Sequence, residues 1–323
     1  MNSDEMRPPF VSRLNQYYLE IENIMSLLVV GSIAFDSIET PKGSVEDALG
    51  GSATFFAYAA SFFTKPRLVS VVGEDFPAEH RQLLTNRNID TAGLVTQPGK
   101  TFRWKGRYHQ DMNTRDTIAV HLNVFGAYDP VLPDSFRDST HVFLANSSPV
   151  LQKKVLEQVH RPDLVMADTM DLWIETQHDE LLSLLPELDG LVLNDGEARL
   201  LSEDDNLVRA GQAIRKMGPK FVIIKKGEHG AMLFSEDGIF AIPAFPTANV
   251  IDPTGAGDSF AGGIMGYLES DKTPPPGRLR RGMVYGCIMA SLTVEGFGLD
   301  RLTWTKRNEI DERVENYRAM LAF

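Results

Sequence analysis

Residues 252–260 read Asp252-Pro253-Thr254-Gly255-Ala256-Gly257-Asp258-Ser259-Phe260, a polar loop with two glycines that runs into an apolar segment. Phe260, Ile264 and Leu268 then recur at every fourth position, which is the spacing of the buried face of a helix. The pattern therefore predicts a core-facing helix whose first turn begins near Gly257.

The loop before this helix is a candidate anion site. The first amides of a helix have no intrahelical partner and the macrodipole is positive there, so a negatively charged group is stabilised. We expect the amides of Gly255, Ala256 and Gly257 to hold such a group, and Asp258 to act as a base toward a substrate hydroxyl. The alternative is structural, because an acidic residue commonly stabilises a first helical turn and Gly-Ala-Gly could be a tight turn.

Apolar runs alternate with helical stretches through the second half of the chain. Runs at residues 142–145, 164–167, 191–193 and 221–225 are separated by segments of helical character, and the first such run lies at 27–31. This alternation is typical of parallel strands joined by right-handed crossovers. We therefore predict an α/β fold with a doubly wound, mostly parallel central sheet and helices on both faces.

Two polar insertions, at about residues 33–49 and 98–125, interrupt this rhythm. In the second, Phe102, Trp104, Gly106 and Tyr108 alternate with basic residues, and a period of two predicts a strand with one apolar face. Together the insertions predict a small β-sheet lid, whose apolar face needs a cover from lid closure or from a second copy in a homodimer. Residues 1–24 are a polar N-terminal extension that we expect to lie outside the domain of residues 25–323.

Composition argues against several classes of protein. The chain has 323 residues with 44 acidic and 32 basic side chains, and its net charge of −12 argues against a nucleic-acid-binding face. The single cysteine, Cys287, cannot form an internal disulfide, which favours a reducing, cytoplasmic location. No apolar run approaches the roughly 20 residues of a membrane span, so we expect no membrane partner.

Two more candidate sites follow predicted strands. Asn194 and Glu197 stand three residues apart where a helix begins, so their oxygens suit a hydrated magnesium ion or, alternatively, a helix cap formed by the pair. Lys225, Gly227 and Gly230 lie in a turn that could wrap an adenine or ribose, or be a plain hairpin. Because ligands bind at the carboxyl ends of strands in such sheets, we expect these segments and the glycine loop to share one cleft.

Taken in order, these motifs resemble those of the ribokinase (PfkB-type) family of ATP-dependent sugar and nucleoside kinases, from residue 27 to the end. Gly31-Ser32 with Asp36 looks like the opening strand and substrate-binding aspartate of that family, and Gly50-Gly51 is similar to its paired glycines. Asn194 and Glu197 match the family's N-x-x-E, and residues 252–258 match its C-terminal signature.

The resemblance implies an activity, cofactors and partners. It implies transfer of the γ-phosphoryl group of ATP to a hydroxymethyl group of a small sugar, with Asp258 as base and the Gly-Ala-Gly amides as anion hole. Magnesium would be held by Asn194 and Glu197 through water, and a potassium ion by Asp252 and Thr254. A nucleoside kinase, or a non-catalytic sugar- or nucleotide-binding sensor with the same fold, is the alternative.

The acceptor cannot be carried over from the family, because Phe55 stands where many sugar-using relatives have Asn. Phe55, with Phe102 and Trp104, could stack on a nucleobase or could be core or dimer packing. Arg103 and Arg115 could engage an anionic substrate or be solvated lid charges. The residues that we expect to contact the acceptor are Asp36, Gly50, Gly51, Phe55 and Arg103.

Overall fold

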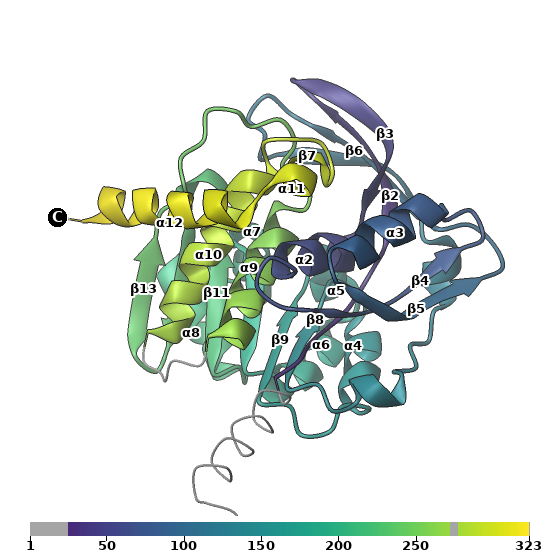
Figure 1. Cartoon of the computed structure of the whole chain (residues 1–323). Coiled ribbons are helices and arrows are strands. Elements are labelled where there is room, and N and C mark those ends of the chain that lie inside the picture. Colours follow the sequence, from purple (N-terminus) through teal and green to yellow (C-terminus); the bar gives the residue numbers. More distant parts are fainter. Residues whose placement is uncertain (1–24, 272–276, 323) are drawn as a thin grey trace, which may run out of the picture.

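The computed structural model describes residues 25–271 and 277–322, and the N-terminal extension lies outside the described residues. Its larger sheet has nine strands in the order β13-β12-β11-β10-β9-β8-β1-β4-β5 (Figure 1). Neighbouring strands from β11 to β5 pair in parallel, and β12 and β13 add an antiparallel edge. The strands are β1 Leu27–Val30, β4 Arg67–Gly73, β5 Asp90–Gln97, β8 His141–Leu144, β9 Leu164–Asp168, β10 Gly190–Asn194, β11 Phe221–Lys225, β12 Ala231–Ser235 and β13 Gly238–Ile242.

Helices cover both faces of this sheet because its strands are apolar on both sides. Along β1, Leu27 and Val29 belong to one buried cluster and Leu28 and Val30 to the other. The first cluster includes side chains of α2 Ser52–Ala60, α3 Ala78–Asn86, α9 Ala256–Ser270, α10 Arg278–Thr293, α11 Asp300–Trp304 and α12 Arg307–Leu321. The second includes side chains of α4 Pro149–Leu156, α5 Asp171–Thr176, α6 His178–Leu184, α7 Asp195–Ser202 and α8 Leu207–Lys216. The predicted doubly wound, mostly parallel fold is therefore confirmed.

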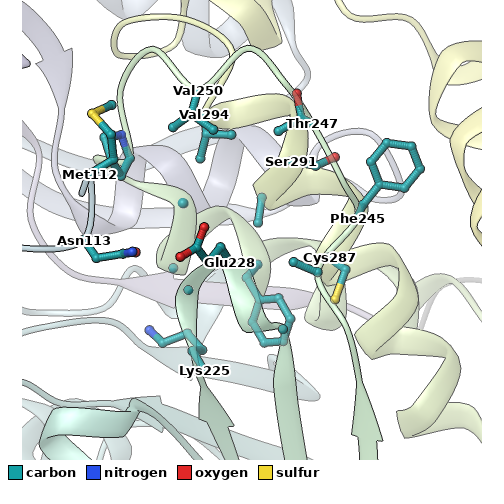
Figure 2. Close-up of a pocket in the computed structure, with 18 of the residues that line it drawn as sticks. Met112, Asn113, Lys225, Glu228, Phe245, Thr247, Val250, Cys287, Ser291 and Val294 are labelled. Atoms are coloured by element: carbon teal, nitrogen blue, oxygen red, sulfur yellow. The ribbon is translucent and has the colours of Figure 1, made fainter. Parts of the chain in front are cut away.

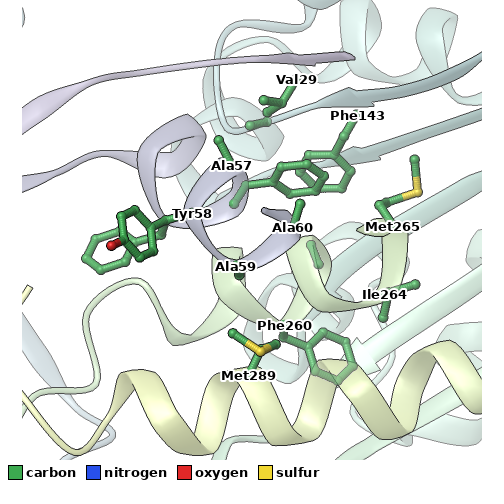
Figure 3. Close-up of a cluster of buried hydrophobic side chains, with 14 of the residues drawn as sticks. Val29, Ala57, Tyr58, Ala59, Ala60, Phe143, Phe260, Ile264, Met265 and Met289 are labelled. Atoms are coloured by element: carbon green, nitrogen blue, oxygen red, sulfur yellow. The ribbon is translucent and has the colours of Figure 1, made fainter. Parts of the chain in front are cut away.

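Glycines allow α9 to lie directly against α2. A Cβ at Gly262 would stand 2.3 Å from the backbone oxygen of Phe56, and one at Gly266 would stand 2.9 Å from the Cα of Ala60. Beside this contact, Phe143 of β8 stacks on Phe56 with ring centroids 4.3 Å apart (Figure 3). The close packing fixes the position of α9, and hence of the glycine loop that precedes it.

A smaller sheet of four strands forms the lid, in the order β3-β2-β6-β7. Figure 1 shows it standing away from the larger sheet. Its strands are β2 Ala34–Thr40, β3 Gly43–Gly50, β6 Phe102–Tyr108 and β7 Arg115–His121. The register places Asp36 beside Trp104 and Tyr108 beside Arg115, so these four side chains share one face of the lid.

Short 3₁₀ helices complete the connections. They are η1 Asn123–Ala127, η2 Asp134–Phe136, η3 Leu185–Glu187 and η4 Gly227–His229. The last of these follows β11 and belongs to the turn in which the sequence predicts a nucleotide site.

Candidate active site

The glycine loop ends where α9 begins, as the sequence predicts. Gly255 is the N-cap and has a left-handed backbone with φ of 76°. A Cβ at this position would stand 2.3 Å from the ring of Phe55, so both backbone conformation and space require glycine. The Ala256 amide donates to the carbonyl of Pro253 (3.2 Å), whereas no backbone partner occurs among the described residues for the amides of Gly255 and Gly257.

Asp258 follows in the first turn of α9, in a cluster of acidic side chains. Burial raises the pKa of Asp258 to about 6, while the charges of Lys225 and Arg115 act to lower it. Burial likewise raises the pKa of Asp36 to about 7, and the charges of Asp252 and Asp258 add to that rise. The lid carboxyl and the carboxyl of α9 therefore lie near enough to repel each other.

Asp36 fits over the paired glycines. A Cβ at Gly50 would stand 1.9 Å from Oδ2 of Asp36, so only glycine leaves room for this carboxyl. The Gly51 amide donates to the same oxygen at 3.4 Å. The structure thus brings together Asp36, Gly50 and Gly51, which the sequence predicts as neighbours of the acceptor.

Asp168 is a buried acid of this cluster that the sequence analysis missed. It ends β9, is 5% exposed, and its Oδ1 has no hydrogen-bond partner among the described residues. Burial raises its pKa well above the ordinary value, and the charge of Asp258 raises it further. A signal was present, because Asp168 follows the apolar run 164–167 just as Asn194 follows the run 191–193.

Two basic side chains face these acids. The ammonium of Lys225, at the end of β11, lies 2.7 Å from where a Cβ of Gly257 would stand. The charge of Arg115, at the start of β7, acts on the pKa of Asp36, Asp258 and Glu197. Neither Lys225 nor Arg115 forms an ion pair within the described part of the chain. Their charges are therefore available to a ligand.

Asn194 and Glu197 form a capping box at the start of α7. The Glu197 amide donates to Oδ1 of Asn194 at 2.8 Å, and the Asn194 amide donates to Oε2 of Glu197 at 2.6 Å. Burial raises the pKa of Glu197, although Lys225 opposes this. Asn194 and Glu197 therefore cap the helix, as one of the two interpretations of the sequence expects. Magnesium binding by Oε1 of Glu197 or by further lone pairs of the two side chains stays a prediction.

A cavity of about 520 Å³ adjoins the glycine loop on the side of α10 (Figure 2). Its size falls within the range of small-molecule sites, and its walls are mainly apolar. Lys225, Gly227 and Gly230 line it together with Gly257, so the structure brings these predicted residues to one cavity. The cavity is also lined by Met112, Asn113, Glu228, Val250, Cys287 and Val294.

Asp252 holds the glycine loop in place through hydrogen bonds of its carboxylate. It is 0% exposed, its Oδ1 accepts from the Thr254 amide at 2.9 Å, and its Oδ2 accepts from the Gly298 amide at 3.2 Å. The Thr254 hydroxyl donates to the hydroxyl of Tyr108 in the lid at 3.2 Å. Burial raises the pKa of Asp252. These contacts tie the loop to the segment between α10 and α11 and to the lid.

Two predicted acceptor contacts need correction. Phe55 is 1% exposed and packs under Gly255, so its ring supports the glycine loop from the core and cannot stack on a substrate. Arg103 lies on the opposite face of the lid from Asp36, because it pairs with Phe35 in the register. There it forms ion pairs with Asp47 and, at 3.2 Å, with Asp75. Arg115 takes the place on the cleft-facing side that the sequence analysis gave to Arg103.

The described residues contain no group of three or more His, Cys, Asp or Glu side chains able to hold a metal ion by themselves. Within the same residues, no helix is long and apolar enough to cross a bilayer.

The known proteins with sequences similar to this chain include several kinases. Residues 25–305 match the model of the pfkB family of carbohydrate kinases. The chain is similar to a cytidine kinase from Thermococcus kodakarensis, 28% identical over 76% of this chain and 89% of that protein. It is also similar to an inositol 3-kinase from Arabidopsis thaliana, 24% identical over 90% of this chain and 79% of that protein.

Solved structures share the fold. A structure from E. coli assigned to a ribokinase II, in complex with ATP and Mg²⁺, covers 90% of this chain and 99% of its own, with a TM-score of 0.75 and 22% identity. The Burkholderia thailandensis nucleoside kinase in complex with inosine covers 90% and 97%, with a TM-score of 0.72 and 21% identity. Given the extent of the family match, the chain belongs to the pfkB family of carbohydrate kinases.

Proposed function

We propose that the protein transfers the γ-phosphoryl group of ATP to a hydroxymethyl group of a small sugar or nucleoside. The proposal depends on one observation. Asp258, in the first turn of α9, lies close enough to the buried carboxyls of Asp36 and Asp168 to raise the pKa of each, and Lys225 acts on Asp168 and Asp258 next to a cavity of suitable size. Neighbouring carboxylates repel one another and are costly to bury, so a cluster of them is typical of a catalytic or ligand-binding site.

Asp258 is the proposed base. As the acceptor oxygen bonds to the γ-phosphorus, Asp258 takes the hydroxyl proton; the bond to the β,γ-bridging oxygen breaks, and ADP leaves with that electron pair. The amides of Gly255 and Gly257 and the ammonium of Lys225 would stabilise the charge on the transferred group. Asp36 would orient the acceptor by hydrogen bonding to its hydroxyls.

The residues present fit a magnesium ion that arrives with ATP. The Oδ1 of Asp168 is buried without a partner, and carboxylate oxygens are hard ligands that suit magnesium directly or through water. Asp168, Glu197 and Asn194 would hold the ion, which when bound neutralises charge on the phosphates. Potassium belongs to the same proposal through Asp252, because this buried carboxyl has no ion pair among the described residues.

Of the two acceptor classes, a nucleoside is favoured by Trp104. Its indole lies on the same face of the lid as Asp36 and within 5.7 Å of the Arg115 guanidinium carbon, measured to the ring centre. A flat base can stack on such a ring, whereas a sugar gains less from it. The nucleoside kinases among the relatives support the same choice.

A panel assay tests the proposal. ADP formation from Mg-ATP would be measured with ribose, fructose, inositol, cytidine, inosine and adenosine, each against a reaction without acceptor. We expect at least one nucleoside to raise the rate by an order of magnitude or more, as catalysed transfer requires. A preference for a free sugar would change the acceptor class. A chain that binds ATP but forms ADP with none of them would behave as the sensor alternative.

Pairing of two copies through the lid is a further part of the proposal. Ile118, Val120 and Leu122, in and beside β7, are 47%, 49% and 45% exposed, which is unusual for large apolar side chains on an edge strand. A second lid would cover them. Light scattering of the wild type and of Val120→Lys would test this, since a dimer lost in the variant supports pairing and a monomeric wild type contradicts it.

A further inference from the structure

The turn between β6 and β7 is the part of the lid that reaches the cavity beside the glycine loop. Asp111, Met112 and Asn113 line this cavity, and Figure 2 shows Met112 and Asn113 on the side away from Phe245 and Cys287. The Oδ1 of Asn113 lies 2.9 Å from where a Cβ of Gly227 would stand, so the turn contacts the segment after β11. The lid therefore borders two regions, the acceptor side at Asp36 and this cavity.

The turn is held in one conformation by its own hydrogen bonds. Oδ1 of Asp111 accepts from the amides of Asn113 at 3.0 Å and Thr114 at 2.9 Å, and Oδ2 accepts from the Thr114 hydroxyl at 2.6 Å. Met112 has a φ of 56°, a left-handed conformation that is uncommon for a residue with a side chain. The turn thus presents the Met112 side chain to the cavity at some conformational cost.

The charged side chains that line the cavity indicate which end of a bound nucleotide would lie near the turn. Lys225 lies beside Gly257, where a phosphate would be favoured, whereas Asp111 belongs to the turn and Glu228 follows Gly227, which the turn contacts, so these two carboxylates repel phosphates there. The carboxylate of Glu228 suits the amino group of a base or the hydroxyls of a ribose, which are hydrogen-bond donors. The base and ribose would therefore lie at the turn and the phosphates at α9.

We propose that the β6–β7 turn of the lid is part of the nucleotide site, with Met112 packing on the base or ribose and Asn113 hydrogen-bonding to it. The inference rests on the proposed function, since it takes the cavity to be the site of ATP. A flexible thioether is well suited to cover a flat ring.

In this proposal, the β6–β7 hairpin contacts both the nucleotide and the phosphate acceptor. Tyr108 and Arg115, which flank the turn, face Thr254 and the acids of the cleft. A nucleotide that holds the turn in place also holds these side chains over the acceptor. The two affinities are then coupled, and each ligand strengthens the binding of the other by the same factor.

Hydrogen–deuterium exchange of the whole chain, with and without MgADP, tests the proposal without any substitution. We expect slower exchange both at residues 225–230 and 244–257 and at the turn, residues 109–114. Protection of the first two segments without the turn would overturn the inference while leaving the proposed function intact. No protection anywhere, together with no measurable MgADP binding, would count against the proposed function itself.

Met112→Gly supplies the matched substitution, because glycine adopts the left-handed backbone without strain and removes only the side chain. The dissociation constant for MgADP, measured by calorimetry, should rise by about three- to tenfold, as expected for loss of part of an apolar contact. Asn113→Ala should weaken binding in the same direction. Lys105→Ala is the control, since Lys105 is an exposed residue on the opposite face of β6. Unchanged affinity in both turn variants would refute the proposal.

Discussion

Burial and the neighbouring positive charges shift the pKa of Asp258 in opposite directions, and the resulting pKa sets the pH above which Asp258 can accept a proton. Burial raises its pKa to about 6, and Lys225 and Arg115 prevent a larger rise. A base must be deprotonated, so kcat/KM should increase with pH up to about 6 and then level off. A pH profile of ADP formation between pH 5 and 8 checks this, and a flat profile would contradict it.

Asp258→Asn should lower kcat by about a hundred- to ten-thousandfold, which is the usual contribution of a general base. Folding should be intact, because the amide has nearly the same shape and avoids the cost of a buried charge. Thermal unfolding and initial rates would be measured together. Asp237→Asn, in an exposed turn, is the matched control. Turnover within about twofold of wild type would show that Asp258 is not the base.

Arg115 makes a prediction that separates a catalytic from a structural role. Its charge lowers the pKa of Asp258 and Asp36, so Arg115→Ala should move the acidic limb of the pH profile to higher pH as well as reduce kcat/KM. Arg115→Lys should restore the position of the limb but only part of the rate, because lysine keeps the charge and loses the planar fork. An Arg115→Ala profile that falls in rate without shifting would assign Arg115 a packing role.

The residues of the site could be predicted from sequence only in part. Local motifs were enough to place Asp36 beside Gly50 and Gly51 and Asp258 in the first turn of α9, because these positions depend on one hairpin and one helix start. Phe55 and Arg103 could not be decided, since strand register and tertiary burial determine where their side chains point. Asp168 lies outside any motif and becomes evident only when the ends of neighbouring strands are compared.

At the scale of elements, the position of α9 depends on glycines that contact α2. A Cβ at Gly262 would stand 2.3 Å from a backbone oxygen, which cannot move aside as a side chain can. Gly262→Ala should therefore reduce the free energy of unfolding by about 1–3 kcal/mol. It should also lower kcat, because Asp258 lies about one turn earlier in the same helix. Chemical denaturation and rate measurements would check both effects.

Gly282→Ala in α10 is the matched control for this prediction. A Cβ there would meet Ile264 and Leu268 at 3.4 Å or more, an ordinary contact distance. Alanine is favoured over glycine within a helix by about 0.5–1 kcal/mol, so this variant should be as stable as wild type or more so. If the two variants were equally destabilised, close packing of α9 would not be the reason.

The elements themselves were largely predictable. Apolar runs and turns gave the parallel strands, and the alternation of Phe102, Trp104, Gly106 and Tyr108 gave the lid strand. What the sequence could not give was the register between β2, β6 and β7, including a shift between Lys105 and Gly106. That register decides which lid residues face the cleft, and it arises from pairings between segments far apart in the chain.

For the whole molecule, the cluster of buried acids predicts how stability changes with pH. Burial raises the pKa of Asp36 and Asp258 to about 7 and about 6, above the ordinary 3.8. Between these values the folded state binds more protons than the unfolded state, so stability falls as pH rises through this window. The melting temperature of the protein without ligand should drop between pH 6.5 and 7.5, above the range in which the buried His141, with its pKa lowered to about 4, acts in the opposite direction.

Asp168→Asn should raise the melting temperature at pH 7.5, because burial opposes ionisation of this carboxyl and the amide cannot ionise. The same variant should lose activity if Asp168 helps to hold magnesium. A wild-type melting temperature that rises over the same pH range would contradict the account of the acids.

Cys287 has a practical consequence for work on this protein. It is the single cysteine of the chain, it lines the proposed nucleotide cavity, and burial raises the pKa of its thiol to about 11. Thiols react as thiolates, so this sulfur should be inert to mild oxidants and to maleimides at neutral pH. A cysteine introduced on the surface would then be modified selectively, which makes the natural chain a ready background for single-position fluorophore labelling of the lid.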